Sequence, residues 1–274
     1  MHPLLAAPSA CALSSELESH SGYHAAVEAA VARFPSISLD DVGPATLMER
    51  LDSKFLVPVH TIPDLLEQCA GQFRVLEVGG RRLCRYATTY LDTDDLAFFR
   101  AHQTGRLPRR KVRLRRYVET GARFLEVKVK TNKKRTMKTR VPLADGASLD
   151  ELLPGLLNAT SADGPLSTSI HVDYVRVTFV STTRNERVTF DFALTLSFKG
   201  EILTYPGVSI IEVKRATRGS SWFLDAMRRQ CVRAQRFSKY CVGVSALRAE
   251  ATRSRDLRML RLLNTVNDRS THAR

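Results

Sequence analysis

Hydrophobic and charged side chains alternate along residues 108–143, and this alternation predicts three consecutive strands. In the first strand the apolar positions are Val112 and Leu114. The charged positions of the three strands are Lys111, Arg113 and Arg115, then Glu126, Lys128 and Lys130, then Lys138 and Arg140. Because successive side chains in a strand point to opposite faces, each strand has one charged row and one apolar row.

The same alternation recurs in three distant segments, separated by largely apolar residues. These segments carry Arg50, Asp52 and Lys54, then Arg187, Thr189 and Asp191, then Glu212 and Lys214. A solvated basic face is the simpler interpretation of any one segment. The recurrence favours a barrel whose covered outer face is apolar and whose lumen is charged.

Other patterns predict helices and further strands around these segments. A helix is expected after Thr61, where Pro63 occupies the first turn, and another is expected from Ser220 or Ser221 through Arg233. Short helices are also predicted at 94–102 and 148–157, a hairpin at 170–198, and a helical tail at 244–263. Strands occur in runs without strand–helix–strand alternation, which predicts an α+β fold built on an antiparallel sheet.

This pattern divides the chain into three parts. Residues 1–44 are predicted to be a largely irregular N-terminal extension, 45–245 a single main domain, and 246–274 a basic helical C-terminal tail.

The net charge of the chain indicates what kind of partner it binds. The 274 residues carry a formal net charge of +14, which indicates an anionic partner. The five cysteines show no metal-ligand spacing, so free thiols in a cytoplasmic, reducing compartment are expected. No apolar run is long enough to predict a transmembrane segment, and the N-terminus lacks the basic region of a signal peptide.

The sequence lacks the motifs that are typical of several classes of enzyme. There is no GxxxxGK[ST] or GxGxxG loop, no HExxH and no GxSxG. Clustered Arg and Lys are suited to phosphoryl transfer, in which positioning and charge neutralisation supply most of the catalysis. Glu212 and Glu126 are candidate oxygen ligands for Mg²⁺ or Mn²⁺, with a salt bridge to a lumen lysine as the alternative for each.

Nine segments in this order resemble a known family, the VTC domain of polyphosphate polymerases. They are MERLDSKF, TTYLDT, KVRLRRY, FLEVKVK, MKTR, VDYVRVTF, ERVTFDF, IIEVK and RFSKY. The resemblance spans roughly Leu47 to Val244 and places the chain in the triphosphate tunnel (CYTH-like) superfamily. It implies an antiparallel β-barrel tunnel with flanking helices, in which basic residues bind ATP and polyphosphate with a divalent cation.

The resemblance and the charged rows together yield a set of expected site residues. Expected to act in catalysis are Lys54, Arg113, Arg115, Lys128 and Arg187. Expected to bind phosphate are Arg50, Lys138, Arg140, Lys214, Ser238 and Lys239, and Glu212 and Glu126 are the metal candidates. Ser238 and Lys239 are expected to follow a helix, where a hydroxyl and an ammonium can bind phosphate at the mouth of the tunnel. The superfamily's ExExK signature is here Arg50-x-Asp52-x-Lys54. The arginine in place of the first glutamate removes a metal ligand, which favours the VTC branch over two-metal triphosphatases and class IV adenylyl cyclases.

The expected function is therefore transfer of the γ-phosphate of ATP onto a polyphosphate chain. Two alternatives remain: a triphosphatase of the same fold, and a non-catalytic module that binds polyphosphate. Nucleic acid is a less favoured ligand, because only Tyr117 and Phe124 lie near the basic rows as candidates for base stacking.

Overall fold

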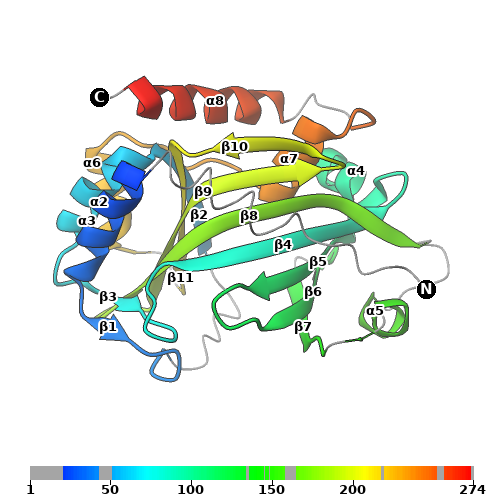
Figure 1. Ribbon diagram of the computed structural model, residues 1–274, viewed down its shortest axis with the longest axis horizontal. Helices are drawn as coiled ribbons and strands as arrows, with labels where there is room; N and C mark the ends of the chain where they lie inside the picture. Colours follow the sequence, from blue (N-terminus) through cyan, green and yellow to red (C-terminus); the bar gives the residue numbers. More distant parts are fainter. Residues whose placement is uncertain are drawn as a thin grey trace.

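A computed structural model describes residues 21–42, 51–133, 136–144, 146–147, 149–157, 165–216, 219–251 and 256–272. Its main feature is one large, predominantly antiparallel sheet with the strand order β2-β11-β9-β8-β4-β5-β6-β7 (Figure 1). The strands in this order are β2 (Leu51–Pro58), β11 (Val208–Arg215), β9 (Glu186–Phe198), β8 (Leu166–Ser181), β4 (Cys84–Thr93), β5 (Arg109–Tyr117), β6 (Arg123–Lys130) and β7 (Thr136–Pro142). Three shorter strands branch from it: β1 (Ser36–Ile37), β3 (Phe73–Leu76) and β10 (Glu201–Tyr205).

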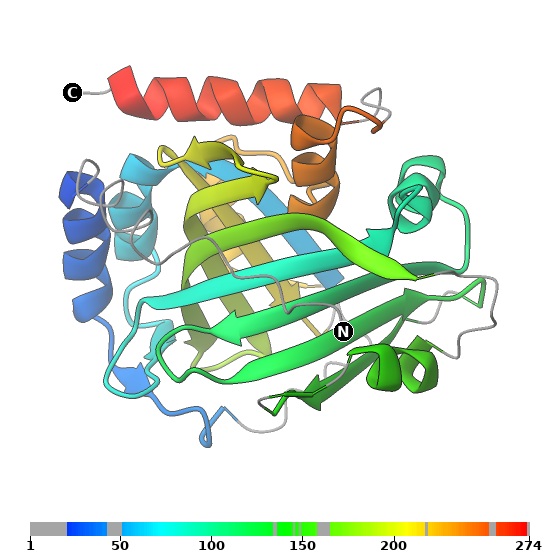
Figure 2. The same cartoon turned by 45° about the vertical axis from the view of Figure 1, so that its right-hand side comes forward.

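The sheet curls around one concave side (Figures 1 and 2). Side chains from β2 and β11 at one end of the strand order, and from β5, β6 and β7 at the other, line the same cavity. Within the described ranges, no ladder of backbone hydrogen bonds joins β2 to β7, so the tunnel is a curled sheet and not a fully hydrogen-bonded barrel. The predicted α+β tunnel fold is confirmed in this form.

The alternation of the sequence explains which face of each strand is covered. On β5 and β6, the outward-facing Val112 and Leu125 are fully buried, in a cluster with Leu153 of α5 (Leu149–Leu157). On β9 and β11, Val188 and Ile211 are likewise buried outside the lumen. Each such side chain contributes about 1.5–3 kcal/mol by leaving water, and together they support the charged inner face.

Helices cover the convex side of the sheet at two places and close one end of the concave side. The helices α2 (Ser21–Ala32), η1 (Val59–Thr61), α3 (Ile62–Glu67) and α6 (Trp222–Arg229) pack on the outside near β3 and β8. The helices α4 (Ala97–Thr104), α7 (Lys239–Leu247) and α8 (Leu257–His272) contribute buried side chains to a second hydrophobic cluster. Figure 1 shows α8 lying along β10.

The helix α7 lies directly against the sheet. A Cβ on Gly243 would lie 2.9 Å from Ile170 of β8 and 3.5 Å from Leu196 of β9, so only glycine permits this approach. Ile170 and Val172 share the inner face of β8 with Tyr174 and Arg176. The concave face is therefore apolar where α7 packs and polar beyond it.

Two helix boundaries differ from the predicted ones. The helix α6 starts after Ser221 as predicted, but it ends at Arg229, whereas the prediction continued to Arg233. Cys231 adopts φ 56°, and the amides of Cys231 and Val232 donate to the carbonyls of Arg228 (2.9 Å) and Met227 (3.0 Å). This is a Schellman ending with cysteine where glycine is usual.

The predicted helix at 244–263 is instead two helices, α7 and α8. Ser238 and Lys239 were expected to follow a helix, and this was wrong: they begin one. Ser238 is the N-cap of α7 and accepts a hydrogen bond from the amide of Cys241 at 3.2 Å.

The segments predicted to flank the main domain contribute to the hydrophobic core. Val27 and Val31 of α2 are buried, as is Leu263 of α8. Among the described residues, no helix has the length and apolar character needed to cross a membrane.

Candidate functional site: a cationic tunnel

The concave side of the sheet encloses a cavity of about 790 Å³. Basic side chains outnumber acidic ones in its lining. The basic ones are Lys54, Arg82, Lys111, Arg113, Arg115, Lys128, Lys138, Arg140, Arg176, Arg187, Lys214 and Lys239. The acidic ones are Asp52, Glu119, Glu126, Asp191 and Glu212. So large an excess of cations in a concave site creates a strong positive potential that favours a polyanion.

All predicted site residues that the structure describes line this cavity. They are Lys54, Arg113, Arg115, Glu126, Lys128, Lys138, Arg140, Arg187, Glu212, Lys214, Ser238 and Lys239. Arg50, predicted to bind phosphate, lies outside the described residues.

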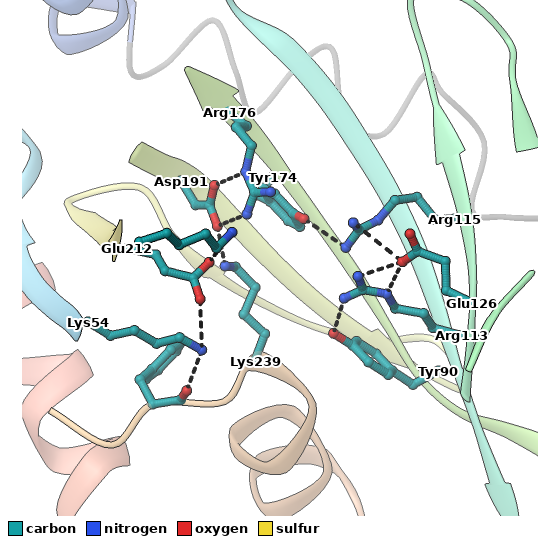
Figure 3. Close-up of polar contacts among 12 residues, drawn as sticks. Lys54, Tyr90, Arg113, Arg115, Glu126, Tyr174, Arg176, Asp191, Glu212 and Lys239 are labelled. Atoms are coloured by element: carbon teal, nitrogen blue, oxygen red, sulfur yellow. Dashed lines mark hydrogen bonds and ion pairs between the residues drawn. The ribbon is translucent and has the colours of Figure 1, made fainter. Parts of the chain in front are cut away.

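Glu126 of β6 lies at the centre of four cations on one wall. Figure 3 shows two of them, Arg113 and Arg115. Arg113 Nε donates to Glu126 Oε2 at 2.6 Å, and Lys138 Nζ lies 3.2 Å from Oε1. Arg115 and Arg140 follow at 3.6 and 3.9 Å. Burial alone would raise the pKa of Glu126, but Arg113, Arg115 and Lys138 outweigh it and hold the pKa at about 2.

Glu212 of β11 lies on another wall with fewer partners. Its carboxylate oxygens are 2.9 Å from Lys214 Nζ and 3.8 Å from Lys54 Nζ. Burial acts to raise its pKa, but Lys214 and Lys54 hold the pKa well below its ordinary value. Lys54 also donates to the carbonyl of Phe237 at 3.1 Å, which ties β2 to the segment before α7.

Asp191 of β9 forms a third carboxylate centre, with Arg176 and Lys239. Arg176 donates from Nε to Asp191 Oδ1 at 2.6 Å and from Nη2 to Oδ2 at 2.7 Å, and Lys239 at the start of α7 donates to Oδ2 (Figure 3). Burial would raise the pKa of Asp191, yet the two cations bring the pKa to about 2. Arg176 was missed by sequence reasoning, although Tyr174, Arg176 and Thr178 show the same alternation in the sequence.

The N-terminus of α7 joins the wall through Lys111. Lys111 Nζ donates to Ser238 Oγ at 2.8 Å and lies 5.6 Å from the centre of the Tyr240 ring. Burial lowers the pKa of Lys111. The Tyr240 hydroxyl donates to Asp92, a fully buried carboxylate that also accepts the amides of Phe98 and Phe99 at 2.9 Å. This network fixes the position of the Ser238–Lys239 pair relative to β4 and α4.

Aromatic side chains are more numerous in the cavity than the sequence predicted. Besides Tyr117 and Phe124, the lining contains Tyr86, Tyr90 and Tyr174. Arg113 Nη1 lies 3.4 Å from Tyr90 Oη. Burial would raise the pKa of Tyr90, but Arg113 and the other nearby cations lower it to about 8.

A divalent cation fits this site only with oxygen ligands that come from the substrate. Among the described residues, no three His, Cys, Asp or Glu side chains gather into a metal cluster. Mg²⁺ commonly uses one or two carboxylates together with phosphate oxygens and water. Glu212 can supply one such carboxylate, whereas Glu126 is surrounded by cations.

Comparisons with solved structures identify folds that resemble this one at low sequence identity. A candidate adenylate cyclase from Bacillus halodurans is 13% identical, with a TM-score of 0.44, over 69% of this chain and 94% of that one. A candidate adenylyl cyclase from Hippeastrum with a dominant triphosphatase activity is 10% identical, with a TM-score of 0.45, over 72% of this chain and 96% of that one. A search of curated proteins found no match.

The family model of the VTC domain matches residues 49–248. This match covers the strands that carry the charged rows and the Ser238–Lys239 pair at the start of α7. The chain therefore belongs to the VTC domain family.

Proposed function

We propose that this protein is a metal-dependent polyphosphate polymerase that transfers the γ-phosphate of ATP onto a polyphosphate chain. The observation that carries the proposal is the convergence of basic side chains from β2, β5–β9, β11 and α7 on one cavity. A single phosphate needs only a few donors. Cations contributed by most of the strands around a cavity of about 790 Å³ are suited to a chain of phosphates.

In this reaction a terminal oxygen of polyphosphate attacks the γ-phosphorus of ATP, the bond to the bridging β–γ oxygen breaks, and ADP leaves. Arg113, Arg115 and Arg176 supply forked donors to the phosphate oxygens, and Lys54, Lys128 and Lys239 supply point charges. Arg187, Lys138, Arg140 and Lys214 extend this lining. Their positive field stabilises the charge on the transferred group and the leaving ADP.

We infer that Glu212, and not Glu126, is the metal ligand of the reaction. Glu126 has four cations within 4 Å, which leaves no space for a fifth, divalent one. Glu212 contacts two lysines that can turn toward bound phosphates. When bound there, Mg²⁺ or Mn²⁺ would neutralise phosphate charge and orient the β- and γ-phosphates.

Product analysis tests the proposal and separates it from the two alternatives. The purified protein is incubated with ATP and Mn²⁺, and the products are resolved by gel electrophoresis and by a free-phosphate assay. A ladder of polyphosphate supports the polymerase. Release of free phosphate without a ladder would indicate a triphosphatase, and ATP that stays intact would indicate a binding module.

A further inference from the structure

Two tyrosine rings stack against each other in the wall of the tunnel. Tyr86 of β4 and Tyr174 of β8 are register partners on adjacent strands, with ring centres 5.2 Å apart and planes 11° from parallel. Both rings line the cavity. Tyr117 of β5 meets Tyr86 edge-on at 4.9 Å. An inorganic phosphate chain has no apolar surface, so direct contact with phosphate does not account for these two rings.

Three cations of the proposed site gather over this pair. The guanidinium of Arg176 lies 5.0 Å from the Tyr86 ring centre and 5.2 Å from that of Tyr174. Arg115 lies 5.3 Å from the Tyr86 ring centre, and Lys239 lies 4.5 Å from that of Tyr174. Arg115 also donates to the Tyr174 hydroxyl at 3.2 Å (Figure 3). The two rings are thus in contact with cations from β5, β8 and the start of α7.

A ring and a carboxylate stabilise a buried cation in different ways. Asp191 and Glu126 neutralise their partners and compete with an incoming phosphate for the same donors. The face of an aromatic ring attracts a cation through its quadrupole without adding negative charge. Contact with the ring face keeps the charge of the cation and occupies none of its N–H groups, although Arg176 and Lys239 also donate to Asp191.

We propose that Tyr86 and Tyr174 are positioning residues that hold Arg115, Arg176 and Lys239 ready for a triphosphate. The inference rests on the proposed function, because it assigns to these rings the preparation of the phosphate-binding cations. The competing role would be stacking of the adenine base on the same rings. A mutation of the rings would then weaken binding of ATP but not of tripolyphosphate, whereas a positioning role predicts that both bind more weakly.

Calorimetric titration with tripolyphosphate and with a nonhydrolysable ATP analogue separates them. Tyr86→Leu removes the ring, and we expect it to weaken both ligands equally, by roughly 5- to 30-fold relative to Tyr86→Phe, which keeps the ring face. Phe179→Leu is the matched control, because Phe179 lies on the outer face of β8 in the apolar core. That variant is expected to lose stability and keep its affinity.

Fluorinated phenylalanines at position 86 provide a second measurement that preserves ring shape and folding. Each added fluorine weakens the ring quadrupole, so affinity for tripolyphosphate should fall stepwise with the number of fluorines. Loss of affinity for the ATP analogue alone, or equal affinity in all fluorinated variants, overturns the inference. Failure of the unmodified protein to bind tripolyphosphate would instead overturn the proposed function.

Discussion

Glu126 and Glu212 carry the same functional group in the same cavity, but their surroundings give them different roles. Glu126 is 3% exposed and holds four basic side chains together, so it organises the wall formed by β5, β6 and β7. Glu212 has two lysine partners and is more open. At the residue scale, the number of neighbouring cations separates a structural carboxylate from a candidate metal ligand.

Arg113→Ala is expected to weaken binding of a nonhydrolysable ATP analogue by about 1.5–3 kcal/mol, the usual value of a charged hydrogen bond. The variant should also unfold more easily, because Glu126 loses its nearest cation. Arg116→Ala is the control, since Arg116 lies on the same strand but is exposed and outside the cavity lining. Calorimetry that finds equal affinity in the two variants would place Arg113 outside the binding site.

Glu212→Gln should suppress metal-dependent turnover more strongly than nucleotide binding. The change keeps the shape of the side chain and removes its charge, while the basic residues still hold the phosphates. Turnover measured against Mn²⁺ concentration, with the exposed Glu201→Gln as control, checks this. Wild-type activity at ordinary Mn²⁺ concentration would make Glu212 an ion-pair partner of Lys214 only.

Acid should remove the stabilisation that Glu126 provides. Its pKa is about 2 in the folded protein against 4.5 in the unfolded chain, so the unfolded state binds the proton first. The contribution is complete above pH 4.5 and is lost as the pH falls toward 2. Urea unfolding should therefore show Glu126→Gln less stable than wild type at pH 7, with the difference shrinking through this window. A constant difference at all pH values would contradict the assignment.

At the scale of elements, the sequence predicted the strands better than the helix ends. Lys111, Arg113 and Arg115 line the cavity, as period-two alternation predicted. A one-residue shift in strand pairing would move this whole charged row into the apolar core, so the pattern determines which face is inside. The same reasoning could have found Arg176, whose strand alternates equally clearly. The end of α6 was not predictable, because its left-handed residue is Cys231 and not glycine.

Cys231→Gly is expected to stabilise the protein by about 0.5–1 kcal/mol. Cys231 is exposed and has φ 56°, a conformation that strains any residue with a Cβ, and glycine removes the strain at the cost of a more flexible unfolded chain. Cys231→Ala, which keeps the Cβ, is the control and should gain nothing. The midpoint of urea unfolding under reducing conditions is measured for both variants and for the wild type. Equal midpoints for Cys231→Gly and Cys231→Ala would show that the strain is absent.

At the scale of the whole molecule, the sequence predicted the charged lumen but not the pairing within it. Which carboxylate meets which cation depends on strand register and on side chains that approach from distant elements, as when Lys239 of α7 reaches Asp191 of β9. The stacking of Tyr86 on Tyr174 likewise depends on the pairing of β4 with β8. Such contacts join residues far apart in the chain, and local pattern carries no information about them.

The central claim is that these basic residues form an enclosed site for a chain of phosphates. It is tested most directly by thermal unfolding with tripolyphosphate and with equimolar sulfate, at low and at near-physiological salt. A ligand that binds only the folded state stabilises it, so tripolyphosphate at 100 times its Kd should raise Tm by roughly 5–10 °C. Sulfate should do far less, because it cannot bridge several strands, and the tripolyphosphate effect should persist where salt screens exposed charges. Equal responses to both anions that vanish near physiological salt would mean an open cationic surface and would contradict the account.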